Sequence, residues 1–421
     1  MSPLQIPRLL RVRDVRLLWA GETVTALGTA VSGVAMPLVA IEVLDASVLA
    51  VTLLTAATWL PWLVVGLPAG AWVDRLPKRP VLVVCDASSL LLLLSVPLAA
   101  WAGALTALHL LAVNLGLGLA TVFFRTAWTA YVPTVVAPEE LMPANALLHG
   151  SESAAHVAGP GLAGLLAAAV GAVGALIADA VSFALSTLFL LRISAVEQVR
   201  PAQPRRLLAE VTEGVHLLSR DRFLRNLVVH GALANLPLVG YGALSVPFLV
   251  REAGQGPAAV GLILAVGGLG GVIGASVSTR VSRALGSARA LVVLKAWAGP
   301  CALLLPLADD GWRITLFLLG SVLVGLGVVG GNVISASFRQ TYVPPELLGR
   351  VMAAMQFCNL GTIPVGAVLA GLLAQNLGTR TALALLTAAY ACSGLLLAFG
   401  PLRGRRDLPL REPAAAAPVP R

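Results

Sequence analysis

The chain has 421 residues, of which 58% are hydrophobic and only 12% are charged, and its mean hydropathy is +0.88. A soluble domain carries about a quarter charged residues, so this composition excludes a water-soluble enzyme of this size. It also excludes a disordered chain, because such chains are poor in apolar residues. The net charge of +9 and the pI near 10.2 would indicate nucleic acid as a partner only if the charge lay on one exposed face.

Apolar runs between charges and turn residues predict twelve membrane-spanning helices, since a bilayer span takes about 20 apolar residues. The first run is too long for the core of a cleavable signal, so we expect it to remain as the first span. In chain order the spans are expected at residues 17–43, 48–73, 80–101, 106–131, 144–170, 173–193, 226–250, 257–279, 287–307, 313–338, 350–376 and 380–400.

The basic residues fall on alternate connections. Twelve spans place both termini on one side of the membrane, and 25 of the 29 Lys and Arg residues fall on that side. This asymmetry predicts a multi-pass protein of the cell membrane with both termini in the cytoplasm. It also argues against nucleic acid as a partner, because the positive charge is spread along one membrane face.

The first six spans resemble the last six. Residues 130–133 match 341–344, residues 162–166 match 369–373, and Gly171 corresponds to Gly378. Duplicated helical bundles are the architecture of secondary transporters, with the substrate cavity between the repeats. We therefore expect an all-α integral membrane protein with two pseudo-symmetric six-helix bundles. The expected parts are the two bundles, 1–193 and 226–402, a cytoplasmic central loop, 194–225, and a disordered cytoplasmic tail, 403–421.

The connection between the second and third spans contains a Gly, then Asp-Arg, then a basic pair. Asp74 can cap a helix or pair with an Arg, and the cations can hold the loop at anionic headgroups. This pattern resembles the cytoplasmic loop motif of the major facilitator superfamily, which implies its twelve-helix fold and a latch that closes the inner gate. The second-half copy has Ser278 in place of the acid, so any latch is one-sided. The motif residues are Gly70, Asp74, Arg75, Lys78 and Arg79.

The fifth span is similar to the Gly-Pro motif of antiporters in the same superfamily, although Ala163 stands where a second Gly is usual. Residues 140–147 resemble the branch that contains the enterobactin exporter and macrolide efflux proteins. The resemblance implies proton-driven export of small molecules. The Arg that drug antiporters often carry midway along the fourth span is missing here. The motif residues are Gly159, Pro160 and Gly164.

Ionisable residues inside spans are functional candidates because a charge in the bilayer is costly. Asp86 and Arg125 are expected at the same depth, about 9 Å from one boundary, which predicts an ion pair at the inner gate that Asp74 can join. Glu152 lies one helical turn before His156, so the two can pass a proton. Lys295 is expected to extend to the cytoplasmic interface. The proton-site candidates are Glu22, Glu152 and Asp179; for each, a neutral or water-facing role is the alternative.

The resemblance implies that spans one, four, seven and ten line the substrate cavity. Their walls are mostly apolar, which favours a hydrophobic or amphiphilic ligand over a sugar or a peptide. The polar and aromatic candidates are Thr25, Asn114, Asn235, Tyr241 and Asn332.

The leading hypothesis is a secondary active transporter that exports a drug, an antibiotic or a siderophore-like metabolite in exchange for protons. An importer of a small metabolite and a non-transporting receptor or scaffold are the alternatives. The sequence contains no nucleophile elbow, metal-spaced cluster or ATP-binding loop, so we expect neither an enzyme nor a bound metal or cofactor. The expected partners are a small-molecule substrate, protons and membrane lipid, and the expected state is a monomer.

Overall fold

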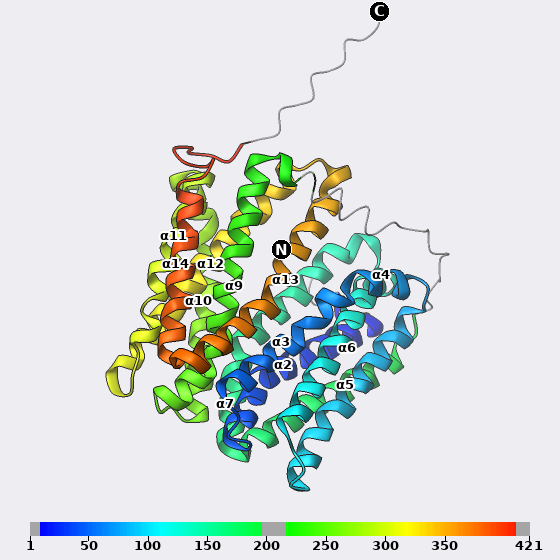
Figure 1. The fold of residues 1–421 in the computed structure, drawn as a ribbon. Coiled ribbons are helices and arrows are strands. Elements are labelled where there is room, and N and C mark those ends of the chain that lie inside the picture. The colour runs from blue at the N-terminus through cyan, green and yellow to red at the C-terminus, as the bar shows by residue number, and fades with distance from the viewer. Residues whose placement is uncertain (1–8, 196–215, 217, 410–421) are drawn as a thin grey trace, which may run out of the picture.

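The computed structural model describes residues 9–195, 216 and 218–409, and in these it contains helices and no strand. Figure 1 shows the helices of the first half, coloured blue to teal, as one bundle and those of the second half, green to red, as another beside it. The first half contains α2 (Arg13–Glu42), α3 (Val48–Val64), α4 (Gly66–Asp74), α5 (Lys78–Trp101), α6 (Ala107–Val135) and α7 (Leu141–Arg192). The second contains α9 (Arg222–Pro247), α10 (Pro257–Leu285), α11 (Ser287–Ala302), α12 (Ile314–Tyr342), α13 (Pro345–Leu377) and α14 (Thr379–Ala398).

The predicted twelve spans can be recovered from these helices. Ten of the described helices are long and apolar enough to cross a bilayer, and the bent pair formed by α3 and α4 adds an eleventh. The 52-residue α7 contains two helices that meet at Gly171. A straight helix of that length would measure about 78 Å, against an apolar bilayer thickness of about 30 Å. Instead the chain folds back on itself at Gly171. Gly159, before this turn, packs against Ala30 of α2, and Ser182, after it, packs against Gly28 of the same helix. Thus α7 supplies two spans.

The internal repeat is visible in the backbone. Gly171 has φ +79° and ψ 160°, and Gly378, between α13 and α14, has φ +85° and ψ 154°. Both lie in a region that glycine adopts freely and that strains other residues. The two halves therefore turn between their fifth and sixth spans with the same glycine conformation.

Twelve spans bring both ends of the described chain, Leu9 and Pro409, to one side of the bundles, which we call the terminal face. The two halves share a hydrophobic core only toward the opposite face. One cluster there joins residues such as Val39 and Leu54 of the first half to Phe248 and Ala370 of the second. Toward the terminal face each half has a cluster of its own, drawn from residues 9–195 in one case and 218–408 in the other.

The contact at the opposite face is reinforced by polar groups. The Nη2 atom of Arg251 lies 2.9 Å from Oδ1 of Asp45 and donates to the carbonyl oxygen of Ala46 at 2.7 Å, so that a connection of the second half is tied to one of the first. The bundles are therefore joined at the opposite face and diverge toward the terminal face.

The start of the expected disordered tail is ordered, which corrects the prediction for residues 403–409. The Arg406 carbonyl accepts a hydrogen bond from the Ala288 amide (3.1 Å), and Asp407 Oδ1 accepts one from the Ser287 amide (2.9 Å). The physical reason is that the first N–H groups of α11 lack partners within their helix. The remainder of the tail and most of the central loop lie outside the described residues.

The two halves are in close contact where α7 crosses α10. Gly164 and Gly261 face each other there, and a Cβ on Gly164 would lie 2.5 Å from the Pro257 carbonyl oxygen and 2.8 Å from Cα of Gly261. Small residues permit such close packing of membrane helices. Since the obstructing atoms are backbone, no side chain can move aside to admit a larger residue.

Replacing Gly164 with Val should separate α7 from α10 and lower stability by about 2 kcal/mol or more. The measurement is the thermal unfolding midpoint of the protein in lipid nanodiscs. Gly150→Val is the matched control, because Gly150 is also in α7 and a Cβ there meets nothing within 4 Å. Equal midpoints for the two variants would contradict the close crossing.

Candidate functional site

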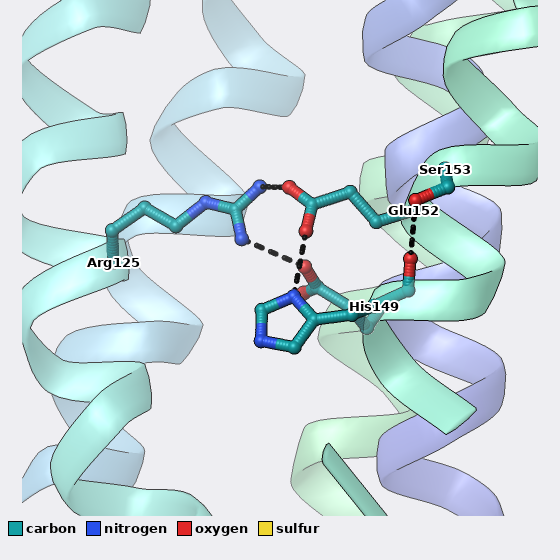
Figure 2. A network of polar contacts seen from close by, with 5 residues as sticks. Arg125, His149, Glu152 and Ser153 are labelled. Carbon is teal, nitrogen blue, oxygen red and sulfur yellow. Dashed lines mark hydrogen bonds and ion pairs between the residues drawn. The ribbon is translucent and has the colours of Figure 1, made fainter. Parts of the chain in front are cut away.

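Three charged side chains from three helices meet inside the first half. Arg125 of α6 places Nη1 3.3 Å from Oε1 of Glu22 in α2 and Nη2 2.7 Å from Oε1 of Glu152 in α7. We call Glu22, Arg125 and Glu152 the triad. Figure 2 shows Arg125 extending from its helix to Glu152. The arrangement allows each carboxylate to neutralise the same guanidinium.

Helix geometry explains why these three side chains meet. Counted from the helix ends at the terminal face, each residue lies about 15 Å along its helix, at about 1.5 Å per residue. At that depth a lone charge is costly and a partner at the same level relieves the cost. The triad thus lies at one depth within the first half, and the Arg125 and Glu152 side chains remain 39% and 26% exposed.

The triad borders a cavity of about 350 Å³ inside the first half. The cavity is also lined by three other predicted residues, Thr25, Asp86 and Pro160, and by apolar side chains such as Phe124 and Phe183. Ligand pockets of drug-like molecules are of this size and are mostly apolar with a few polar groups. The proton candidates Glu22 and Glu152 therefore line the same cavity as a substrate candidate.

The predicted ion pair between Asp86 and Arg125 does not form, because Arg125 pairs with Glu22 and Glu152 instead. Asp86 lines the cavity but is only 1% exposed, and its Oδ2 has no hydrogen-bond partner within the described part of the chain. Its depth is about 12 Å from the start of α5, close to the depth of Glu22 in α2. Equal depth predicts the Asp86–Arg125 pair, but the direction in which each side chain leaves its helix determines which carboxylates Arg125 contacts.

The histidine partner of Glu152 also differs from the prediction. His149 Nδ1 lies 3.4 Å from Oε2 of Glu152, three residues along the same helix (Figure 2). His156 lines the cavity and has no such contact with Glu152 in the described structure. Glu152 therefore lies between an arginine and a histidine.

The third proton candidate occupies a separate cavity of about 250 Å³ nearer the opposite face. Asp179 is 2% exposed there and accepts a hydrogen bond from Ser182 Oγ at 3.0 Å. Asn114 lines the same cavity and accepts a hydrogen bond from Thr58 Oγ1 at 3.1 Å. Neither residue belongs to the triad.

Comparison with known proteins decides the family. The model of the Major Facilitator Superfamily matches residues 18–363. The chain belongs to that superfamily. It is 28% identical to the multidrug efflux pump Tap of Mycolicibacterium fortuitum over 415 residues, with 93% of this chain and 96% of the relative covered. It is also 28% identical to Tap of Mycobacterium tuberculosis over 385 residues, with 88% and 89% covered.

Solved structures agree on the fold. A bacterial homologue of the iron transporter ferroportin in an inward-facing state has a TM-score of 0.75 at 16% identity, with 92% of this chain and 98% of that chain covered. The outward-facing state of a ferroportin homologue gives a TM-score of 0.60, with 91% and 98% covered. This confirms the all-α fold of the Major Facilitator Superfamily, and the protein is a multi-pass membrane transporter.

The loop motif, residues 70–79, lies at the terminal face. Its basic pair makes hydrogen bonds to backbone carbonyl groups, whereas its acid is exposed. Arg79 donates from Nε to the carbonyl oxygen of Leu190 at 2.9 Å and from Nη2 to that of Leu191 at 2.5 Å, which anchors the end of α7. Lys78 Nζ donates to the Leu76 carbonyl at 2.7 Å. Asp74 ends α4 and is exposed, so in this conformation it points away from the helix packing.

The small residues of the Gly-Pro motif are at helix contacts. Gly159 packs on Ala30 of α2, whereas Gly164 meets α10 of the other half. Pro160 borders the triad cavity and its carbonyl oxygen faces Gly261. The motif therefore connects the cavity to the contact between the halves.

The substrate candidates of the second half have different environments. Asn235 donates from Nδ2 to the Asn359 carbonyl at 3.0 Å, so it joins α9 to α13. Tyr241 packs edge-on against Tyr390, with ring centroids 6.4 Å apart. Asn332 is exposed and accepts a hydrogen bond from Lys295 Nζ at 2.7 Å. Asn332 is thus the accessible candidate of the three, and the sequence had not linked it to Lys295.

A double-mutant cycle should distinguish the observed ion pair from the predicted one. Combining Arg125→Met with Glu152→Gln should show a coupling energy on the order of 1 kcal/mol, because the two side chains are in contact. Combining Arg125→Met with Asp86→Asn should give a value near zero. The coupling is measured from thermal unfolding in nanodiscs, and a larger value for the Asp86 cycle would contradict the triad.

Proposed function

We propose that the protein is a proton-coupled exporter of small hydrophobic or amphiphilic molecules, such as drugs, antibiotics or siderophore-like metabolites, and that it works by alternating access. The observation that carries this proposal is the triad beside a drug-sized cavity. Membership of the superfamily and similarity to multidrug efflux pumps support transport and favour export.

The triad has the charge balance that a proton site needs. Two carboxylates and one guanidinium leave a net charge of −1, and one bound proton would make the group neutral. A charge is costly within the bilayer, so the two states differ in how readily the bundle can move. The Glu22 side chain is 8% exposed and 3.3 Å from Arg125, whereas Glu152 is 26% exposed and 2.7 Å away. Glu22, the more buried and less tightly paired carboxylate, is therefore our proton carrier.

Exchange follows from the position of the triad. The substrate would occupy the cavity bordered by Glu22 and Arg125, and its arrival would favour release of the proton there. Protonation from the other side would then favour release of the substrate. One set of side chains would thus bind proton and substrate in alternation, as antiport requires.

Alternating access is supported by the contacts between the halves. They meet at the opposite face, through the Arg251–Asp45 pair and the shared core, and diverge at the terminal face. The excess of Lys and Arg at the terminal face favours its assignment to the cytoplasm. In that orientation the conformation is open to the cytoplasm, and the exposed Asp74 is a latch that is not engaged. We assign the protein to the cell membrane as a monomer.

Transport is tested in cells that express the protein, with and without an uncoupler. The probes are uncharged Nile red, cationic ethidium and anionic dansylglycine. Export of at least one probe that the uncoupler abolishes is the expected result. Proton-independent uptake would instead indicate the importer, and the absence of transport of all three would contradict the proposal.

Replacing Glu22 with Gln should remove the titrating group and lower proton-driven efflux by about tenfold or more, the effect of about 1.4 kcal/mol. Probe exchange without a gradient should persist, because the cavity keeps its shape. Both are measured in proteoliposomes. Glu139→Gln is the control, since Glu139 is exposed in the turn between α6 and α7 and outside the cavity. Full gradient-driven transport by Glu22→Gln would exclude Glu22 as the carrier.

A further inference from the structure

The second half contains a lysine within the ninth span that does not extend to the membrane interface. Lys295 lies eight residues into α11, about 12 Å from its start at the terminal face. Its Nζ donates to Oδ1 of Asn332 at 2.7 Å and lies 3.4 Å from the carbonyl oxygen of Val328. The side chain therefore crosses to α12, which differs from the expected path toward the cytoplasm.

The surface of α12 explains this path. Gly327 and Gly330 face α11 and α10, and the stem of Lys295 lies over Gly331, where any larger residue would block it. Asn332 is the next residue along α12 and is exposed. Arg339 follows seven residues later, which returns it to the face of Asn332 two turns closer to the terminal face. An amide and two cations thus share one side of this helix.

These two cations have no carboxylate partner within the described residues. Arg339 lies about two helical turns from Asn332 along α12, and its Nε is buried without a hydrogen bond to any described residue. The described acids of the second half lie near helix ends. Asp221 accepts a hydrogen bond from Tyr342 at 2.7 Å, and Glu252 pairs with Arg380 at the opposite face. The second half therefore differs from the first, where Arg125 has two carboxylates.

We propose that Lys295 and Asn332 bind the acidic group of the transported molecule, with Arg339 attracting it from the terminal face, so that the substrates include amphiphilic organic acids. This rests on the proposed transport function. Uncompensated cations at this depth are costly, and an incoming carboxylate or sulfonate supplies the missing charge. The ammonium and the Asn332 amide nitrogen both donate hydrogen bonds, which are stronger when the acceptor is ionised.

The test compares two probes that differ only in charge: dansylglycine, a carboxylate, and dansylglycine amide. Binding is measured by fluorescence on the full chain in nanodiscs without a gradient. Wild-type protein should bind the carboxylate about tenfold more tightly than the amide. Lys295→Met should reduce this ratio to about one, and Lys295→Arg should retain most of it. Arg280→Met, which removes an exposed cation of α10, should leave it unchanged.

Equal affinity for the two probes, binding of neither probe, or an unchanged ratio in Lys295→Met would overturn the proposal. If Lys295→Met does not fold, Asn332→Ala is the deciding variant, because it keeps the lysine and removes the amide donor. We expect this variant to bind the carboxylate over the amide with a reduced affinity ratio. An unchanged ratio would contradict the proposal. Because binding needs no gradient, a failure here leaves uncoupler-sensitive export of Nile red intact. Failure of proton coupling would conversely leave the charge preference intact.

Discussion

The need to neutralise charge inside a bilayer organises the first half of this transporter. Arg125 lies in the middle of α6, where a lone guanidinium is costly, and it is stabilised by Glu22 from α2 and Glu152 from α7. The requirement that all three lie at one depth constrains how these helices pack. The cavity lies beside them and is also lined by apolar side chains such as Phe124 and Phe183.

The fold was largely predictable from the sequence because its determinants are local. Hydropathy marks the spans, the distribution of Lys and Arg marks alternate connections, and the repeat shows as paired motifs. Gly171 and Gly378, matched by sequence offset alone, adopt nearly the same backbone conformation. The ordered part of the tail was not predictable in this way. It depends on free N–H groups of α11 that are distant in sequence and have no signature there.

The sequence identifies which charged residues of the site lie within spans, but it does not identify which of them contact one another. Glu22, Arg125 and Glu152 each stand out in the sequence as charges within spans, yet the sequence pairs Arg125 with Asp86, whereas the structure pairs it with Glu22 and Glu152. Boundaries of apolar runs gave too small a depth for Arg125, because α6 continues to Val135. Distance from the helix end does not separate the candidates, because Glu22 and Asp86 lie nine and eight residues from the starts of α2 and α5. The direction that each side chain takes around its helix depends on packing that the sequence alone does not display.

Duplication of the bundle has not duplicated its chemistry. The two halves retain equivalent glycine turns, but the charged side chains within the spans are mostly acidic in the first half, as with Glu22, Asp86 and Asp179, and basic in the second, as with Lys295 and Arg339. A substrate between them would meet a proton-binding surface on one side and, by our inference, an anion-binding surface on the other. In transporters built from two repeats, one repeat moves against the other as a largely rigid body, so this separation has a physical consequence. Proton binding on the first half can affect an anion site on the second only through the bound substrate or through the contact between the halves.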